Sequence, residues 1–559
     1  MPAEIENNNS NFLERIIEDD IQNNVYHRSI RTRFPPEPNG YLHIGSLYAI
    51  NISYNAAKRF GGTFNLRLDD TNPLKEDIKV VNAIIEDMIW AGYDPGDNIF
   101  YGSDYFDRIY ELTIELIKNG MAFVCDLSQE ELRESRGTLM EPGKNSPYRD
   151  RSVEENLKLF DEMKNGRYNP GEKVLRAKID MASPNMNMRD PAIYRILFAD
   201  HYRTGDKWRI YPMYDYAHPI QDAIEGITHS MCSIEFKDHR PLYEWVLNTL
   251  AFAFPEPPKQ REFGRMNITG AITGKRYLRQ LVSQGYVESW DDPRLPTVKG
   301  LRRRGFTVES IHSFLNEIGA ARDYSTVDIS MLENSLRGDL KTKAYTVMAV
   351  LDPLAVEITN YPKDAIECVD VENNAENSDM GSRKLPFSRN ILVEREDFME
   401  TPEKGFHRLY PGNEVRLKGA YFIKCNEIIK DKDGLVIKLL CTYDPATKSG
   451  GNFTERKVKA TLHWLDAGHT LPARVNLYSR LLLNENISGQ EVDWPSYVDP
   501  NSLITMENAR VEESLTSARP EDKYQFIRHG YFVVDMHWEQ GGMLVFNRIV
   551  ALKNTKKKG

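Results

Sequence analysis

Residues 33–46 read RFPPEPNGYLHIGS, and this run marks the boundary between an expected strand before it and an expected helix after it. A short extended segment ends at Phe34, prolines and the Asn39-Gly40 turn interrupt it, and a helix is expected to start near Leu42. The next expected strand, Phe64–Leu68, alternates apolar and polar residues. Strand, helix and strand at this spacing predict a βαβ unit with a parallel sheet.

Further elements are expected on both sides of this unit. An amphipathic helix is expected over residues 12–21, and residues 80–120 read as helical. Residues 211–216 read as a strand, with a helix beginning at Ile220, and residues 299–342 read as helices.

The character of the chain changes after about residue 345. Strand patterns dominate from there on, and Asp433-Gly434 and Gly541-Gly542 have the composition of hairpin turns. The sequence therefore predicts an α/β enzyme body followed by an all-β region built as barrels.

Composition limits the class of protein. The 559 residues suggest three to five domains, and 41% hydrophobic with 28% charged residues indicates a globular chain. No stretch approaches twenty apolar residues, and the polar N-terminus lacks the features of a secretion signal, so we expect a cytoplasmic protein without a membrane span.

Cysteine and charge patterns add two further limits. The five cysteines include no CxxC pair, so neither a disulfide framework nor a cysteine zinc site is expected. The net charge of −10 speaks weakly against nucleic-acid binding. Because the run Arg302–Arg304 and the tail Lys556–Lys558 concentrate positive charge locally, total charge does not decide the matter.

The turn into the first helix carries the densest chemical signal. A helix N-terminus offers unpaired N–H groups and partial positive charge, which suit a triphosphate. His43 could bond a phosphate oxygen as charge shifts, and Gly45 would allow a flat base to approach the backbone. Taken alone, His43 could equally be a helix cap and Gly45 a packing residue.

This run resembles the HIGH signature of class I aminoacyl-tRNA synthetases, and among them that of the glutaminyl-tRNA synthetases. Four further blocks are similar to that family: NLRLDDTNP at 65–73, GKNSPYRDR at 143–151, YPMYDYAH at 211–218 and DAIEGITHS at 222–230. The resemblance covers roughly residues 11–553.

The resemblance implies a reaction and its partners. The carboxylate of L-glutamine attacks the α-phosphate of ATP, which enters with Mg²⁺, and the acyl group then passes to a ribose hydroxyl of tRNA(Gln). No protein nucleophile is needed, so catalysis rests on positioning and on electrostatic stabilisation of the phosphates. We expect a monomer without a bound structural metal.

The resemblance also implies roles for individual positions. The catalytic residues are His43 and Lys275. The ATP-binding positions are Glu37, Pro38, Asn39, His43, Ile44, Gly45, Ser46, Ser233, Arg265, Met266, Thr273, Gly274 and Lys275. The amino acid is expected at Arg33, Asp69, Tyr214 and Gln260. On residue type alone, Asp69 could also be a strand-end cap and Tyr214 a core tyrosine.

Six further positions are expected to contact tRNA. Leu139 aligns with the leucine that opens the first acceptor pair, and Asp238 aligns with the acceptor-stem reader. The positions aligned with anticodon contacts are Arg408, Arg416, Gln525 and Arg528.

The expected fold is α/β, with a Rossmann-like parallel-sheet catalytic domain that carries an inserted domain. The expected segments are an N-terminal tail and helix at 1–25, the two catalytic halves at 26–108 and 211–266, an acceptor-stem-binding insertion at 109–210, a helical linker domain at 267–344, two β-barrel anticodon-binding domains at 345–553 and a basic tail at 554–559.

Three positions depart from the family pattern. Ser46 replaces the second histidine of HIGH, Gly274 replaces the serine of the Met-Ser-Lys-Arg loop, and Thr346 replaces an arginine that reads the middle anticodon base. These departures leave two alternatives beside a glutamine–tRNA ligase: a catalytically weakened paralogue that still binds tRNA, and a non-discriminating glutamyl-tRNA synthetase. The strand-rich region after residue 345 argues against the latter, which normally ends in helices.

Overall fold

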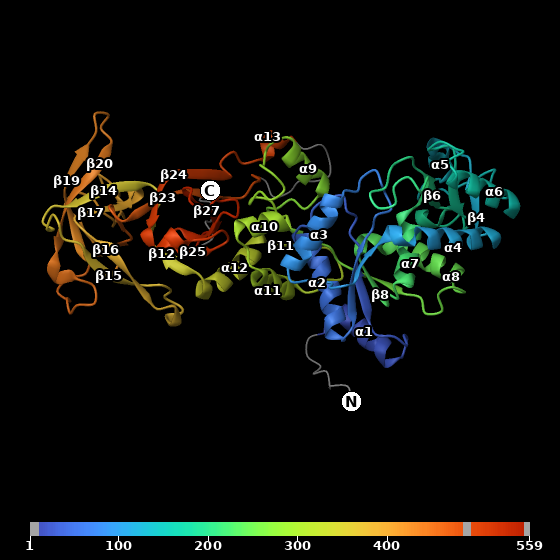
Figure 1. The fold of residues 1–559 in the computed structure, drawn as a ribbon, viewed down its shortest axis with the longest axis horizontal. Helices are drawn as coiled ribbons and strands as arrows, with labels where there is room; N and C mark the ends of the chain where they lie inside the picture. Colours follow the sequence, from blue (N-terminus) through green and yellow to red (C-terminus); the bar gives the residue numbers. More distant parts are fainter. Residues whose placement is uncertain (1–9, 484–492, 553–559) are drawn as a thin grey trace. The chain divides into compact units, whose positions relative to one another are not determined.

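The computed structural model describes residues 10–483 and 493–552. The predicted basic tail and the first residues of the predicted N-terminal tail lie outside this range. The chain divides into two compact units, one formed by residues 1–267 with 315–327 and the other by residues 268–314 with 328–559. Figure 1 labels the elements of both units.

The first unit is built on the predicted βαβ motif. Strands β1 (Arg31–Phe34), β2 (Thr63–Leu68) and β3 (Ile99–Tyr101) form a parallel sheet in the order β1-β2-β3. Helix α2 (Ile44–Arg59) connects β1 to β2 and packs against both strands. The expected parallel sheet is therefore confirmed.

The turn between α2 and β2 requires glycine for steric reasons. A Cβ atom on Gly62 would lie 2.1 Å from the carbonyl oxygen of Ile30, which no larger residue could tolerate. Gly61, immediately before it, has a φ of +63°, in the left-handed region that favours glycine. This close approach sets the point at which β2 begins.

Three of the expected elements are wrong in part. Residues 299–342 were expected to be helical, but within them Ser325–Val327 form strand β11, which pairs with β10 (Met266–Ile268). Within residues 80–120, also expected to be helical, residues 99–101 form β3, because the edge of the parallel sheet offers its backbone a partner. Within the expected strand 211–216, β7 ends at Pro212 and helix α7 (Tyr214–Ile224) begins. Alternating aromatic residues suggested a strand there, but Tyr216, Ala217 and Ile220 are buried together on one face of a helix.

A second sheet of the first unit is antiparallel. It has the strand order β4-β5-β6-β7, and its core includes apolar side chains of helices α4 and α6 (Figure 1). The bounds are β4 Ala122–Cys125, β5 Val174–Ala177, β6 Ala192–Ile196, β7 Ile210–Pro212, α4 Phe106–Lys118 and α6 Val153–Lys164. This sheet lies within the segment predicted to bind the acceptor stem.

The remaining elements of the first unit surround these two sheets. Strands β8 (His229–Ser233) and β9 (Lys259–Phe263) pair in parallel, and β10 (Met266–Ile268) pairs with β11 (Ser325–Val327). The helices are α1 Phe12–Gln22, α3 Ile78–Trp90, α5 Gln129–Ser135 and α8 Arg240–Thr249, with 3-10 helices at Gly102–Tyr105, Met186–Met188 and Ile234–His239.

A fully buried ion network joins the parallel strands to α7. Arg33 Nε lies 3.0 Å from Asp222 Oδ1, and Arg67 Nη2 lies 2.7 Å from the same oxygen. Arg67 Nη1 also lies 3.1 Å from Glu225 Oε1. All four side chains have zero exposed area, so each charge depends on the others for its stability.

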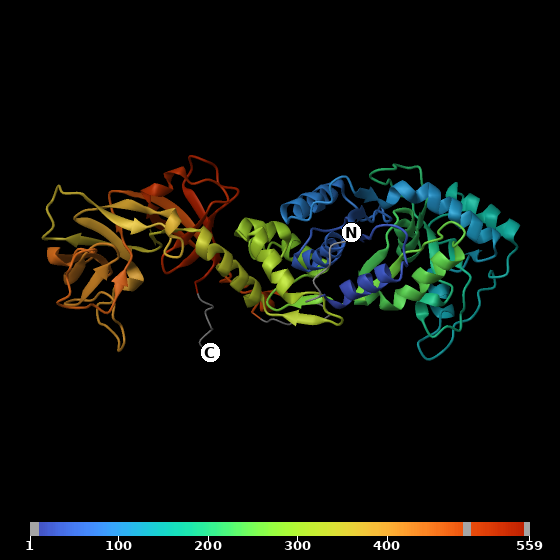
Figure 2. The same cartoon turned by 90° about the horizontal axis from the view of Figure 1, so that it is seen from below.

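The second unit begins with helices and continues into two β-sheets. Helix α12 (Ile329–Lys343) leads directly into β12, as Figure 2 shows. The other helices are α9 Lys275–Ser283, α10 Val298–Arg304, α11 Val308–Ile318, whose last residues group with the first unit, and α13 Trp494–Tyr497.

Each of the two large sheets has seven strands and its own apolar core. The first runs β21-β18-β19-β20-β14-β17-β22, with bounds Thr461–Leu462, Glu414–Leu417, Phe422–Lys430, Val436–Asp444, Pro353–Ile358, Asn390–Glu394 and Leu465–Asp466. The second runs β12-β25-β26-β27-β23-β24-β13, with bounds Tyr345–Val347, Lys523–Phe526, Gly530–Val534, Leu544–Val550, Thr470–Tyr478, Leu503–Glu512 and Ala349–Val350.

Both expected hairpin turns are found in these sheets. Asp433-Gly434 connects β19 to β20, and Gly541-Gly542 connects β26 to β27. A separate antiparallel pair, β15 (Glu367–Glu372) with β16 (Ser382–Phe387), completes the barrel-like region that was expected after residue 345. Short 3-10 helices lie at Ser378–Met380, Arg395–Asp397, Pro445–Thr447 and Glu513–Ser517.

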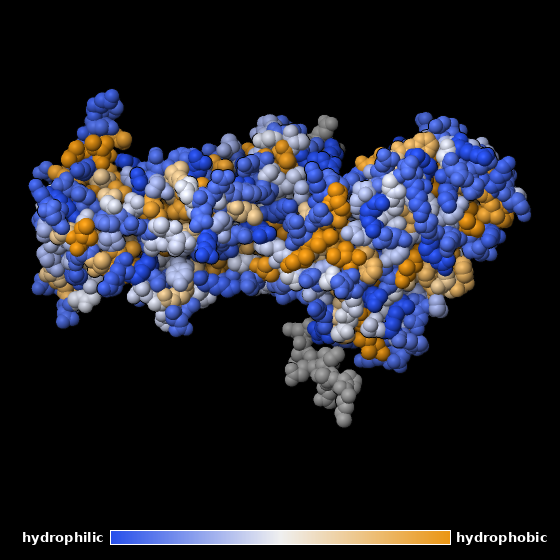
Figure 3. Space-filling model, in the orientation of Figure 1, coloured by the Kyte–Doolittle hydropathy of each residue, from blue (hydrophilic) through white to orange (hydrophobic). Residues whose placement is uncertain are grey.

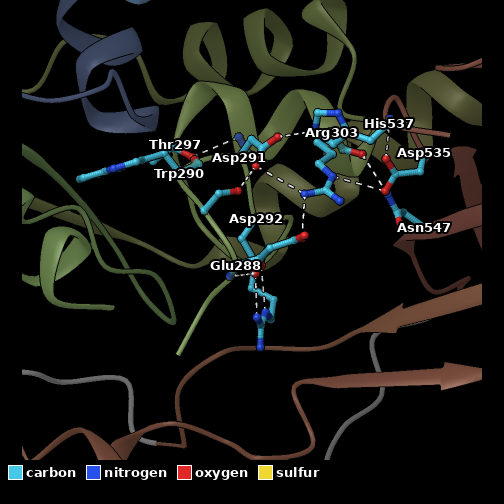
Figure 4. Close-up of polar contacts among 12 residues, drawn as sticks. Glu288, Trp290, Asp291, Asp292, Thr297, Arg303, Asp535, His537 and Asn547 are labelled. Atoms are coloured by element: carbon cyan, nitrogen blue, oxygen red, sulfur yellow. Dashed lines mark hydrogen bonds and ion pairs between the residues drawn. The ribbon is translucent and has the colours of Figure 1, made fainter. Parts of the chain in front are cut away.

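A polar network within the second unit holds its helical segment on the second sheet (Figure 4). Arg303 on α10 lies 3.1 Å from Glu288 and 3.3 Å from Asp535. His537 lies 2.6 Å from Asp291. Because Asp535 and His537 follow β26, these contacts couple the segment that carries Lys275 to the β region.

The exposed apolar side chains of the described residues lie in local groups on the surface. No helix among the described residues is long and apolar enough to cross a membrane. On the face shown in Figure 3, polar residues predominate, and apolar side chains gather below the polar tip of the β19–β20 hairpin. The exposed apolar residues of that hairpin are Ile429, Leu435 and Ile437.

The buried ion network yields a stability prediction. Asp222→Asn removes the shared carboxylate and leaves the buried guanidinium of Arg33 without a carboxylate partner and that of Arg67 with Glu225 alone, so we expect a loss of about 3–5 kcal/mol in the free energy of unfolding. Urea denaturation of the full chain measures it. Asp107→Asn, which removes an exposed carboxylate 2.6 Å from Lys207, is the matched control and should cost less than about 0.5 kcal/mol.

The pH dependence of this effect has a defined sign. Burial alone would raise the pKa of Asp222, but the adjacent guanidinium groups of Arg33 and Arg67 hold it well below its usual range. The stabilisation is therefore present above about pH 4 and lost as the pH falls below it. Equal acid sensitivity of the wild type and Asp222→Asn would contradict this account.

Candidate active site and RNA-facing residues

His43 is the N-cap residue of α2. Its Nδ1 accepts a hydrogen bond from the backbone N–H of Ser46 at 3.3 Å, and its own backbone N–H donates to Ser46 Oγ at 3.4 Å. An Nδ1 that accepts leaves the ring proton on Nε2. The replacement residue Ser46 thus forms a reciprocal capping pair with His43 and supports the tautomer in which Nε2 is the donor.

Gly45 provides the space that this arrangement needs. A Cβ atom at that position would lie 3.0 Å from His43 Cε1 and 3.1 Å from Nδ1. Ile44, also expected at the ATP site, is fully buried in the core, so only its backbone is available to a ligand. The helix N-terminus therefore presents backbone and imidazole rather than an apolar side chain.

The loop before His43 is tied to the end of β2. Asp69 N–H donates to the carbonyl of Pro36 at 2.9 Å, and Asp77 N–H donates to that of Pro38 at 3.3 Å. Glu37 and Asn39 lie on the same loop, which closes through the Asn39 N–H and the Glu37 carbonyl at 2.8 Å. These backbone bonds bring the predicted ATP loop and Asp69 together.

Asp69 is buried in an acidic environment. Its exposed fraction is 6%, and burial raises its pKa to about 7 against the lowering effects of Arg67 and a hydrogen bond from Thr71. Asp70 and Glu37 raise the pKa further. Burial also raises the pKa of nearby Glu76 to about 9. A cationic ligand would relieve this accumulation of carboxyl groups.

Tyr214 and Gln260 meet at Phe236. The Tyr214 ring stacks on His218 at a centroid distance of 5.0 Å and lies 5.6 Å from the Phe236 ring. Gln260 Nε2 donates to the Phe236 carbonyl at 3.0 Å and to Glu262 at 3.1 Å. Both residues expected at the amino acid therefore share one neighbour, and burial raises the pKa of the Tyr214 hydroxyl well above its ordinary value.

The other residues of this unit that are predicted to bind ATP or the amino acid differ in burial and in hydrogen-bond partners. Arg33 is fully buried, and it bonds Asp222, the Met231 carbonyl and Ser230, so it is positioned as part of the ion network. Met266 is buried. Arg265 pairs with Glu235 at 2.9 Å on the surface. The buried hydroxyl of Ser233 has no hydrogen-bond partner among the described residues.

Thr273, Gly274 and Lys275 belong to the second unit, with Gly274 as the N-cap residue of α9. A Cβ atom on Gly274 would lie 3.0 Å from the Tyr277 ring, so a serine there requires a small shift of that side chain. His43 and Lys275 lie in different units. Their convergence on one triphosphate stays a prediction.

The acceptor-facing residues share one supporting segment. Leu139 is 78% exposed on a loop that Arg189 holds through the carbonyl oxygens of Arg136, Thr138 and Glu141 at 2.8–2.9 Å. Asp238 is exposed, and its carbonyl accepts from Asn185 Nδ2 at 2.7 Å. Residues 185–189 thus brace both predicted contacts.

Two of the arginines predicted to contact the anticodon share a buried carboxylate. Asp397, with no exposed side-chain area, lies 2.6 Å from Arg528 and 3.1 Å from Arg408. Gln525 lies on β25 opposite Thr346, whose hydroxyl donates to Gln525 Oε1 at 3.3 Å. Arg416 lies apart from them on β18, with its guanidinium 4.3 Å from the centre of the Phe422 ring.

Several supporting residues were not predicted. They are charged groups that bond the expected ligands or the segments next to them: Arg67, Glu76, Arg189, Asp222, Glu225 and Asp397. Arg67, Asp222 and Glu225 lie inside the blocks that carry the family resemblance, so charge within an apolar pattern was an available signal. Arg189 and Asp397 offered none, since their partners are distant in sequence.

Comparison with known families agrees with this architecture. The catalytic domain of class I tRNA synthetases (E and Q) matches residues 29–341, and two anticodon-binding domains of the same group match residues 344–444 and 461–535. The chain therefore belongs to the class I tRNA synthetases for glutamate and glutamine.

Curated relatives narrow the family to its glutaminyl branch. Proteins named glutamine–tRNA ligase from Clostridium kluyveri and Clostridium perfringens are each 54% identical over 98–99% of this chain and 98% of their own length. One from Pseudomonas putida is 51% identical over 98% of this chain and 96% of its own length. A solved glutamate tRNA ligase from Elizabethkingia meningosepticum is 18% identical, with a TM-score of 0.42 over 56% of this chain and 70% of its own.

The raised pKa of Asp69 yields a second stability prediction. A carboxyl group that titrates at about 7 when folded and near 4 when unfolded makes the folded state less stable as the pH rises between those values. Asp69→Asn should therefore be more stable than the wild type at pH 8, by about 1–4 kcal/mol, with a smaller gain at pH 5. Urea denaturation at both pH values measures the difference. An equal gain at both would show that Asp69 is ionised throughout.

Proposed function

We propose that the protein is a glutamine–tRNA ligase, which forms glutaminyl-adenylate from glutamine and ATP and transfers glutamine to tRNA(Gln). The observation that supports the placement of the amino acid beside ATP is the hydrogen bond between the Asp69 N–H and the Pro36 carbonyl. It places a buried carboxyl group against the loop that leads into the His43 helix terminus. An amino acid and a nucleotide can thereby be bound side by side.

Asp69 would receive the ammonium group of glutamine. Burial, reinforced by the neighbouring Asp70 and Glu37, raises the pKa of Asp69, and a bound cation would favour its ionised form. Tyr214 and Gln260, which meet at Phe236, would hydrogen-bond the carboxamide. Glutamate would place a charged carboxylate against Tyr214 and Gln260, where the proposed hydrogen bonds suit a neutral carboxamide, which disfavours it.

His43 would stabilise the phosphates during activation. Its Nδ1 accepts from the Ser46 N–H, so the ring proton lies on Nε2, which would donate to a phosphate oxygen. The N-terminus of α2 adds backbone N–H groups and partial positive charge. ATP enters as its magnesium complex, and Lys275 would stabilise the departing pyrophosphate.

The RNA-facing residues extend over both units. Leu139 and Asp238 would bind the acceptor end, whereas Arg408, Arg416, Gln525 and Arg528 would bind the anticodon. With Thr346 in place of the family's arginine, Gln525 would be the main polar contact to the middle anticodon base. We expect a monomer that acts in the cytoplasm.

Aminoacylation tests the assignment directly. The purified protein, supplied with ATP, magnesium and total tRNA, should charge tRNA with glutamine and should discriminate against glutamate. Asp69→Asn should lower kcat/KM for glutamine by at least about tenfold, whereas Asp107→Asn should not change it. A folded wild-type protein that charges no tRNA with glutamine, or that charges glutamate equally well, contradicts the proposal.

His43 and Ser46 should differ in their effect on rate. His43→Ala removes a transition-state donor and should lower the rate of glutaminyl-adenylate formation by about 10²–10³. Ser46→Ala removes only the hydroxyl at 3.4 Å from the His43 backbone nitrogen and leaves its own N–H on Nδ1, so we expect less than about a tenfold loss. Single-turnover kinetics with tRNA present measures both. Equal losses would assign the catalytic contact to Ser46 instead.

A further inference from the structure

Three ligand-type side chains meet in the second unit, and none of them is assigned above to ATP, glutamine or tRNA. Glu394 is the last residue of β17, His463 lies between β21 and β22, and His529 lies in the turn between β25 and β26. One ligand atom of each lies within 4.8 Å of the others. The cluster therefore joins the two seven-stranded sheets.

The carboxylate of Glu394 is fixed in place by the backbone. Oε1 accepts the N–H of Leu351 at 2.7 Å, and Oε2 accepts the N–H of Asp352 at 3.1 Å. His529 Nε2 lies 2.7 Å from Oε1, and His463 Nε2 lies 3.5 Å from it. Backbone donors of this kind orient a carboxylate for metal binding, as outer-shell partners do in protein metal sites.

His463 is the least satisfied member of the cluster. Only 1% of it is exposed, yet neither ring nitrogen has a hydrogen-bond partner among the described residues. A neutral imidazole has one donor and one acceptor, and leaving a buried polar group unpaired is unfavourable. A cation between the three side chains would take the acceptor nitrogen.

The spacing suits a small transition-metal ion. Zinc bound at about 2.0–2.2 Å to nitrogen and oxygen in tetrahedral geometry holds its ligand atoms about 3.3–3.5 Å apart. The Glu394–His463 separation is already in this range, and the Glu394–His529 separation of 2.7 Å needs to open by less than about 1 Å. Two histidines and one glutamate form a ligand set that zinc uses elsewhere in proteins, with water in the fourth position.

We propose that Glu394, His463 and His529 bind one divalent transition-metal ion, with zinc as the occupant that the two imidazoles favour. His529, whose side chain is 17% exposed, provides the side from which the ion enters. This departs from the expectation of no structural metal.

A bound metal ion would hold the turn that carries His529 against the seven-stranded sheet that contains β17 and β22. Arg528, the neighbouring residue, is bound there already through Asp397. The ion would therefore support the position of a predicted anticodon contact without contacting RNA itself, and its role would be structural. The site does not depend on the proposed ligase activity, so the two can fail separately.

Metal binding by the full-length, untagged protein tests the proposal. After chelator treatment, Co²⁺ should produce the visible absorption of a tetrahedral site, and calorimetry with Zn²⁺ should show one ion bound per chain. Zn²⁺ should also raise the midpoint of thermal unfolding. His529→Gln should weaken Zn²⁺ binding at least about tenfold and abolish that rise, whereas His407→Gln, which changes an exposed histidine outside the cluster, should change neither.

Two outcomes would overturn the site. One is the absence of saturable binding at one ion per chain in folded protein, which would leave a hydrogen-bonded Glu–His cluster. The other is binding that His529→Gln leaves unchanged, which would place the ion elsewhere. His529→Gln alters a partly exposed turn, and an unchanged unfolding midpoint without metal verifies that it folds.

Discussion

Four ionised side chains in the interior of the first unit, Arg33, Arg67, Asp222 and Glu225, constrain the geometry of everything around them. Each would be very costly to bury alone, so strands β1 and β2 and helix α7 can pack only in the arrangement that pairs them. Asp69 follows Arg67 by two residues, immediately after β2 ends, and the α2 terminus follows β1. The network therefore positions both the Asp69 carboxyl group and the helix terminus capped by His43.

Structural and catalytic interpretations of His43 prove compatible. The residue caps α2 through Ser46, as the plainer interpretation supposed, and the same contact leaves the ring proton on Nε2, as the proposed phosphate contact requires. Asp69 similarly ends a strand and also lies in an acidic, buried environment. A residue at the end of an element has unpaired polar groups nearby, which is why packing and ligand binding coincide there.

The second unit uses buried carboxylates to position basic side chains. Asp397 fixes Arg408 and Arg528 together, so the guanidinium groups are ordered before any RNA arrives. Glu394 plays the corresponding part for His463 and His529 a few residues away. Preordering of this kind lowers the entropy lost on binding.

The sequence by itself determined the βαβ unit, the change to strands after residue 345, both hairpin turns and the family, because these depend on local periodicity, turn chemistry and contiguous motifs. Most of the residues expected to bind ATP, glutamine or tRNA were also identified from these motifs. Only the tertiary structure decided that β3 is a strand, that residues 214–216 are helical, that Arg33 is fully buried, and that Glu394, His463 and His529 meet. Each depends on partners far away in the chain, whose proximity no local pattern records.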